Sequence, residues 1–209
     1  MRRRQIITLV TVIVGAIVLG ISLRIEPGSR WFYPSSIALA AVWTIGALAS
    51  GPLRLGRIST RDEAAYRRPV LQPILLGLAM AVTFSLGALA VRPIDPLAQQ
   101  VANILQFATE GPLAVLVVIT IANGIAEELF FRGAAYAAIT NHPVPWTTLA
   151  YTLATAATGN IMLAFAALLL GALTGMQRRA SGGILAPALT HCTWSVAMLL
   201  VLPAIFGLR

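Results

Sequence analysis

The feature that most limits what this chain can fold into is a series of long apolar stretches without formal charge. Four stretches contain no Asp, Glu, Lys or Arg: residues 5–23, 31–53, 69–91 and 180–208. At about 1.5 Å per helical residue, each is long enough to cross ~30 Å of lipid hydrocarbon. Hydrophobic residues make up 58% of the 209 residues and charged residues only 11%, far from the composition of a water-soluble domain. The sequence therefore predicts that the bilayer is the solvent.

The remaining helices are expected between Gly111 and Gln177. Turn signals at His142–Pro145 and at Gly159-Asn160 divide this region into about three helices, near 113–140, 146–158 and 161–177. Gly171 and Gly175 give the last two of these a small-xxx-small face for close packing. Segments 51–68 and 92–112 are expected to be loops. We predict an all-α fold: residues 1–209 form a single transmembrane domain, a polytopic helix bundle of about seven transmembrane helices.

The net charge of +8 comes from arginines that lie mostly between the apolar stretches. This distribution indicates membrane topology rather than nucleic-acid binding, because cytoplasmic loops are enriched in basic residues. We expect a multi-pass protein of the cell membrane, with the lipid bilayer as its partner, a cytoplasmic N-terminus and a C-terminus outside. The inner set is then Arg2, Arg3, Arg4, Arg54, Arg57, Arg61, Arg67, Arg68, Arg178 and Arg179, and the outer set is Arg24, Arg30, Arg92 and Arg209.

Two adjacent carboxylates and one arginine lie inside an apolar segment, at Glu127, Glu128 and Arg132. Each unpaired charge at this depth costs at least ~2.5 kcal/mol. Glu128 and Arg132 are four residues apart on one helical face, so they can form an ion pair. Glu127 points about 100° away and lacks that partner, which makes it a candidate to accept a proton from water. The alternative is that both glutamates only hold helices together or lie at the membrane surface.

His191 and Ser195 form a second polar face in the last apolar segment, since residues four apart point the same way. An imidazole can bind a metal or polarise a carbonyl group, although it can equally be satisfied by a neighbouring helix. Glu127 lies 13 residues before Thr140, and Asn160 lies 14 residues after Trp146, so each is roughly 20 Å of helix away from the same predicted cytoplasmic turn. We therefore expect Asn160 to be able to meet Glu127.

The string Glu127-Glu128-Leu129-Phe130-Phe131-Arg132-Gly133 resembles the EExxxR motif of the CPBP family, the CAAX-protease and bacteriocin-processing (Abi) intramembrane proteases. Residues 181–191 resemble the segment that leads to the histidine of the family's last motif, and the family-like core covers about 110–205. The resemblance implies that Glu127 activates water and that Glu128 and Arg132 support it. The closing motif falls on His191 and Ser195.

The middle motif of the family, FxxxH, falls by spacing on Ala156 and Asn160, where neither the Phe nor the His is present. Some accounts of the family invoke a metal, so zinc is the candidate cofactor, with His191 and Glu127 as its ligands. Without a metal, Asn160 and His191 can serve as an oxyanion hole, with Ser195 as a further substrate contact.

Three functions remain open at this point. The first is an intramembrane endopeptidase acting on a peptide or protein, prenylated or not. The second is a catalytically silent relative that binds membrane peptides or proteins, as an immunity or assembly factor would. The third is a small transporter with Glu127 as its proton site, which a short chain without internal repeats supports poorly.

Overall fold

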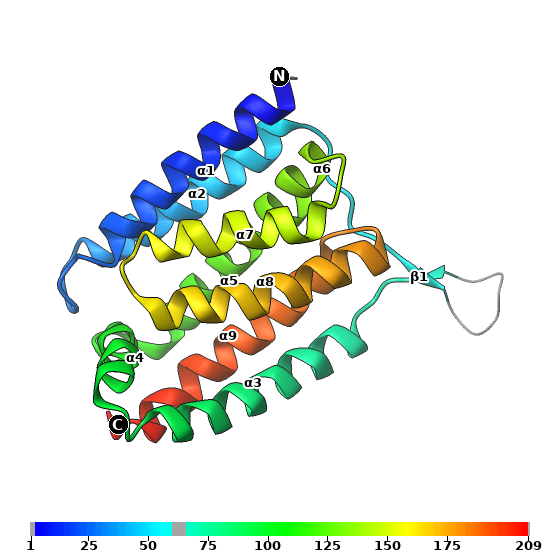
Figure 1. Cartoon of the computed structure of the whole chain (residues 1–209). Coiled ribbons are helices and arrows are strands. Elements are labelled where there is room, and N and C mark those ends of the chain that lie inside the picture. Colours follow the sequence, from blue (N-terminus) through cyan, green and yellow to red (C-terminus); the bar gives the residue numbers. More distant parts are fainter. Residues whose placement is uncertain (1–2, 60–65, 209) are drawn as a thin grey trace.

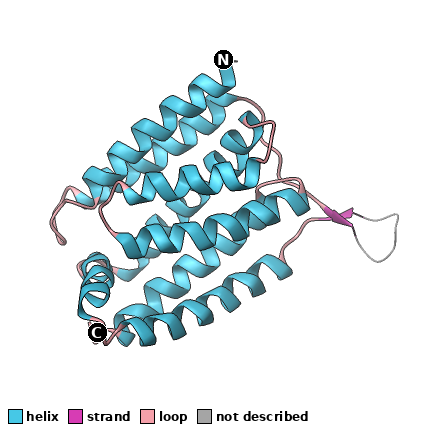
Figure 2. Ribbon diagram, in the orientation of Figure 1, coloured by secondary structure: helices cyan, strands magenta, loops and turns pink. Residues whose placement is uncertain are grey.

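The computed structural model describes residues 3–59 and 66–208 and shows a bundle of helices with one short hairpin (Figures 1 and 2). Arg2, Arg61 and Arg209, assigned above to the two membrane sides, lie outside the described residues. The helices are α1 Arg3–Ser22, α2 Phe32–Ser50, α3 Leu71–Val91, α4 Asp95–Thr109, α5 Leu113–Glu128, η1 Leu129–Ala135, α6 Tyr136–Ala138, α7 Pro143–Ala156, α8 Ile161–Ser181 and α9 Leu185–Ile205. Strands β1 Ile58–Ser59 and β2 Tyr66–Arg67 pair antiparallel.

Among the residues that the structure describes, six helical segments are long and apolar enough to cross a membrane: α1, α2, α3, the continuous segment Leu113–Ala138, α8 and α9. The prediction of a helical membrane bundle is therefore confirmed. The expected seventh helix is α7, which has 14 residues and so spans only about 21 Å, less than the ~30 Å of a hydrocarbon core. It packs along α8 and connects the end of the bundle near α6 to the end near α4 (Figure 1).

The segment expected to be an outer loop contains helix α4, so that part of the prediction was wrong. Asp95-Pro96 begins the helix instead of ending one, because proline is tolerated in a first turn whose N–H groups have no helical partner. Only Leu105 of this helix is buried, and Gln99, Gln100 and Asn103 give it a polar face. Such a helix is amphipathic and does not span the bilayer.

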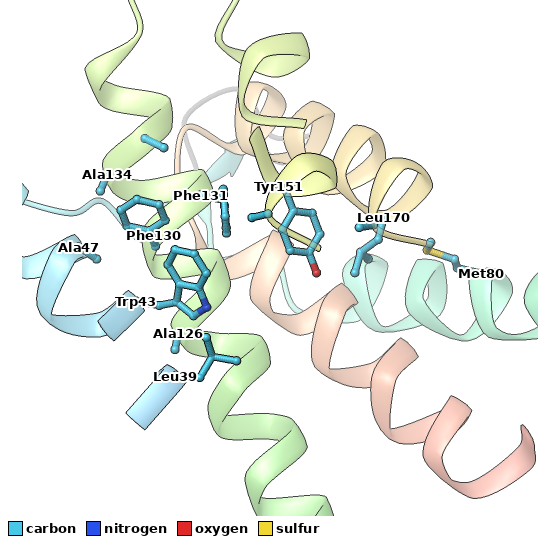
Figure 3. Packing of buried hydrophobic residues seen from close by; sticks show 13 residues of the cluster. Leu39, Trp43, Ala47, Met80, Ala126, Phe130, Phe131, Ala134, Tyr151 and Leu170 are labelled. Carbon is cyan, nitrogen blue, oxygen red and sulfur yellow. The ribbon is translucent and has the colours of Figure 1, made fainter. Parts of the chain in front are cut away.

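The core packs around the junction of α5 and η1. Trp43 of α2 lies 5.0 Å, between ring centroids, from both Phe130 and Phe131, and all three are almost fully buried (Figure 3). Alanines such as Ala47, Ala126 and Ala134 fill the rest, which allows the helices to approach closely. Many large apolar side chains on the outer faces of α1, α2 and α3 are exposed, as expected where lipid replaces water. Large, almost fully buried aromatic side chains therefore pack around the segment that carries the two glutamates.

Candidate active site

The backbone changes its winding immediately after the two glutamates. Residues Leu129–Ala135 form a π-helix, a rare conformation that is frequent at functional sites. Six of its seven residues are buried, among them Arg132. The predicted ion pair is present: Arg132 Nη1 lies 3.1 Å from Glu128 Oε1, and neither side chain is exposed. The π-helix thus holds a fully buried charge pair in the middle of the bundle.

His191 of α9 joins this pair from across the bundle. Its Nδ1 lies 2.8 Å from Glu128 Oε1, although the two residues are 63 positions apart in the chain. An ionised carboxylate only accepts hydrogen bonds, so Nδ1 carries the hydrogen, and in the neutral ring Nε2 presents a lone pair. Glu128 therefore fixes both the orientation of the imidazole and its tautomer.

Glu127 lies on the other side of the imidazole and is the more accessible of the two glutamates. Its Oε2 is 3.9 Å from His191 Nε2, and its side chain is 15% exposed. This separation is longer than a hydrogen bond, and it suits two atoms that share a small bridging partner such as water. Gly124, one turn before Glu128, faces the same imidazole edge without a side chain. The structure thus brings together Glu127, Glu128, Arg132 and His191.

Tyr151 of α7 belongs to the same cluster and was missed from the sequence. Its hydroxyl donates a 2.6 Å hydrogen bond to Glu127 Oε2, and its ring lies 4.9 Å from the Arg132 guanidinium carbon. A signal existed: Thr147, Tyr151 and Thr155 follow one another at four-residue spacing, which makes one polar face on a short apolar helix. All three are buried, so this face is turned into the bundle.

Asn160 does not reach the cluster, so the expectation that it contacts Glu127 was wrong. Its side-chain oxygen accepts a 3.0 Å hydrogen bond from Leu163 N and caps α8, while its amide nitrogen donates to the Gln100 carbonyl at 2.7 Å. Helix α7 continues for five residues beyond Tyr151, about 7.5 Å of helical rise, and ends at Ala156; Asn160 follows in the turn after it. The oxygen and the nitrogen of the Asn160 amide are thus both occupied at the end of the bundle. The amide is not placed beside Glu127, where it would have to stabilise an oxyanion.

Ser195 lies one turn beyond His191 on α9 and is half-buried. Within the described residues, no contact joins its hydroxyl to Glu127 or Glu128. The structure therefore places Ser195 next to the cluster along the helix but not in its hydrogen-bond network.

The residues present do not fit a zinc ion. A catalytic zinc site takes three protein ligands, and the predicted pair, His191 and Glu127, supplies two. Glu128 is the third carboxylate or imidazole group in the cluster: its Oε1 is engaged by Arg132 and by His191 Nδ1, and its Oε2 is buried without a hydrogen-bond partner among the described residues. In the described part of the chain, no group of three His, Cys, Asp or Glu residues is arranged to hold a metal.

Residues 109–197 match the family model described as "Type II CAAX prenyl endopeptidase Rce1-like". This segment, which is less than half of the chain, is similar to the CAAX-protease family. The family resemblance seen in the sequence is thereby confirmed, and the matched CAAX-protease segment contains Glu127, Glu128, Arg132, Tyr151 and His191. Helices α1, α2 and α3 and most of α4 lie outside it. Comparisons with curated proteins and with solved structures gave no match.

Proposed function

We propose that this protein is an intramembrane endopeptidase in which Glu127 activates water to hydrolyse a peptide bond. The observation that carries the proposal is the difference between the two glutamates. Glu128 is fully buried and held by Arg132 and His191, whereas Glu127 is partly exposed and faces His191 Nε2 at 3.9 Å. One carboxylate thus holds the site together, and the other, which has no cationic partner within ion-pair distance other than the imidazole of His191, is positioned to accept a proton. The similarity of residues 109–197 to a protease family supports this assignment.

The reaction begins with a water molecule between Glu127 Oε2 and His191 Nε2. Its oxygen bonds to the carbonyl carbon of the substrate while Glu127 takes one hydrogen as a proton, and the carbonyl π electrons move to the carbonyl oxygen. His191 Nε2 accepts a hydrogen bond from the second hydrogen and orients the attack. When the C–N bond breaks, Glu127 returns the proton to the leaving nitrogen. The products are a carboxylic acid and an amine.

Glu128 and Arg132 act by holding the imidazole. The Arg132 charge offsets that of Glu128 in a region where unpaired charge is costly. Glu128 in turn keeps Nδ1 protonated, so Nε2 faces Glu127 with its lone pair. The substrate we propose is a peptide or protein segment delivered through the bilayer, prenylated or not, since the matched family model is named for prenyl endopeptidases.

We propose that the end of the bundle that carries the N-terminus faces the cytoplasm. The two termini lie at opposite ends of the bundle (Figure 1). The helix ends and connections near the N-terminus carry Arg3, Arg4, Arg54, Arg57, Arg68, Arg178 and Arg179, whereas those at the other end carry Arg24, Arg30 and Arg92. Reporter fusions in the β1–β2 connection and at the C-terminus should therefore report opposite sides of the membrane. The same side for both would overturn this topology.

The decisive experiment compares wild-type protein with Glu127→Gln. Purified protein in proteoliposomes is offered a library of membrane-inserted peptides, and new termini are identified by mass spectrometry. Glutamine keeps the shape but cannot take the proton, so cleavage should fall more than about a hundredfold, equivalent to ~3 kcal/mol or more. His142→Ala, an exposed histidine away from the cluster, is the control and should cleave normally. A cellular phenotype that needs the protein but tolerates Glu127→Gln would favour the silent binding relative instead.

A further inference from the structure

Tyr151 is the one member of the cluster to which the reaction described above gives no task. Its hydroxyl and His191 Nε2 both face Glu127 Oε2, at 2.6 Å and 3.9 Å. The phenol is thus in direct contact with the atom that is to receive the proton from water. Because a phenol donates and accepts hydrogen bonds, it can follow a change in the protonation of its partner.

The Tyr151 ring is fixed on several sides. The Arg132 guanidinium carbon lies 4.9 Å from its centroid, and the Phe131 ring centroid also lies at 4.9 Å. On the α8 side, Gly171 approaches so closely that an added Cβ would lie 3.3 Å from Tyr151 Cδ1. Because the ring is held in this way, the main motion left to the hydroxyl group is rotation about its C–O bond. Its hydrogen can therefore change partners without a movement of the helix.

We propose that Tyr151 is a catalytic residue that donates a hydrogen bond to the substrate's carbonyl oxygen as that oxygen becomes negative. This inference rests on the proposed peptidase function. It assigns to Tyr151 the stabilising contact that the sequence suggested for Asn160, whose amide caps α8 instead. Ser195, which the sequence suggested as a further substrate contact, has no hydrogen bond to either glutamate in the described structure.

The hydrogen bonds balance at each stage. Before attack, the Tyr151 O–H donates to the ionised Glu127 carboxylate. After Glu127 has taken a proton from water, its own O–H donates to the phenol oxygen, and the Tyr151 O–H turns to the oxyanion. When Glu127 passes its proton to the leaving nitrogen, the C=O bond re-forms and the Tyr151 O–H returns to the carboxylate. The phenol remains neutral throughout, so no further proton donor or acceptor is needed.

The test is Tyr151→Phe, which removes one oxygen and keeps the ring. We expect kcat to fall about 10²–10³-fold with KM nearly unchanged, because the contact forms only in the transition state. Tyr136→Phe is the matched control: its ring packs on Arg178 near the end of the bundle, so the same deletion there should leave kcat unchanged. In a Glu127→Gln background, Tyr151→Phe should cause little further loss, since the two groups act together.

Replacing Tyr151 with difluorotyrosine separates a catalytic hydroxyl from a structural one, because the shape and the O–H group remain. The fluorinated phenol ionises more readily, and an ionised phenol cannot donate. The decline of kcat at high pH should therefore begin at lower pH than in wild type, and an unchanged pH profile would overturn the proposal. Normal kcat in Tyr151→Phe, with Glu127→Gln inactive, would also overturn it while leaving the peptidase function standing. Full activity in Glu127→Gln would overturn both.

Discussion

The centre of the bundle and the end of the bundle beside α4 use polar side chains in different ways, and α7 with its following turn contributes to both. In the centre, Tyr151 donates to the side chain of Glu127. At the end, Asn160 bonds to the backbone, capping α8 and reaching the Gln100 carbonyl of α4. Helix ends leave N–H groups without partners, so an amide there is used as a cap. In mid-helix, short hydroxyls such as those of Thr155 and Thr174 bond to the carbonyl four residues earlier, whereas the longer Tyr151 side chain carries its hydroxyl to Glu127 on another helix.

Burial follows the same division. Glu128 and Arg132 in the centre have no exposed surface, while Asn160 lines a cavity of about 360 Å³ together with Gln99, Gln100 and Asn103. The buried charges Glu128 and Arg132 are thus paired with each other in the centre, and neutral amides line the cavity at the end. If this comparison is correct, substitutions in the centre should affect stability or catalysis strongly, and substitutions at the end only modestly.

The largest expected effect is that of Arg132→Ala on stability. Removing the guanidinium strands Glu128 as a buried charge, at a cost of roughly 3–5 kcal/mol in comparable buried pairs. Glu127→Ala should cost less, because it removes a carboxylate without leaving a charge unpaired. Thermal unfolding in detergent measures both, with the exposed Arg179→Ala as control. A lower Tm for Glu127→Ala than for Arg132→Ala would contradict the observed pairing.

The next effect concerns catalysis alone. His191→Ala removes the group that orients water opposite Glu127 and should lower kcat about 10²–10⁴-fold. Ser195→Ala, one turn away on α9, should change kcat by less than about threefold, because the Ser195 hydroxyl is not hydrogen-bonded to Glu127, Glu128 or His191 in the described structure. Steady-state cleavage by the two variants decides the point. Equal losses would mean that Ser195 contacts the substrate.

A smaller effect is expected at the other end of the bundle. Asn160→Ala removes the cap of α8 and should cost about 1 kcal/mol, whereas Asn160→Asp keeps a capping oxygen and should cost less. Neither change should alter kcat of the folded protein. Unfolding and cleavage are measured on the same preparations. A large loss of kcat in fully folded Asn160→Ala would mean that Asn160 takes part in catalysis.

The smallest expected effect is that of Asn160→His on bound metal. The new imidazole would lie at the end of the bundle, so it would not join Glu127 and His191, and zinc content should equal that of wild type. Metal analysis of the two purified proteins gives the result. One additional zinc per chain in the variant would show that the two regions are closer than the structure places them.

The sequence by itself determined the features that depend on neighbouring residues. Uncharged stretches of sufficient length located α1, α2, α3 and α9, because hydrophobicity and helical rise are counted along the chain. The Glu128–Arg132 pair followed from four-residue spacing on one helix. The close packing of α7 on α8 at Gly171 and Gly175 followed from small residues on one face. Each of these inferences needs only the local geometry of a helix.

Only the tertiary structure decided which helices bring their polar groups together. The bond between His191 and Glu128 joins residues 63 positions apart, and no local period encodes that distance. Counting residues from a shared turn placed Asn160 beside Glu127, but α7 ends at Ala156 and the cap of α8 takes the amide. Tyr151 meets Glu127 because packing turns the polar face of α7 toward η1. The positions where helices end and cross depend on the packing of the whole bundle. These positions determined which side chains form the site.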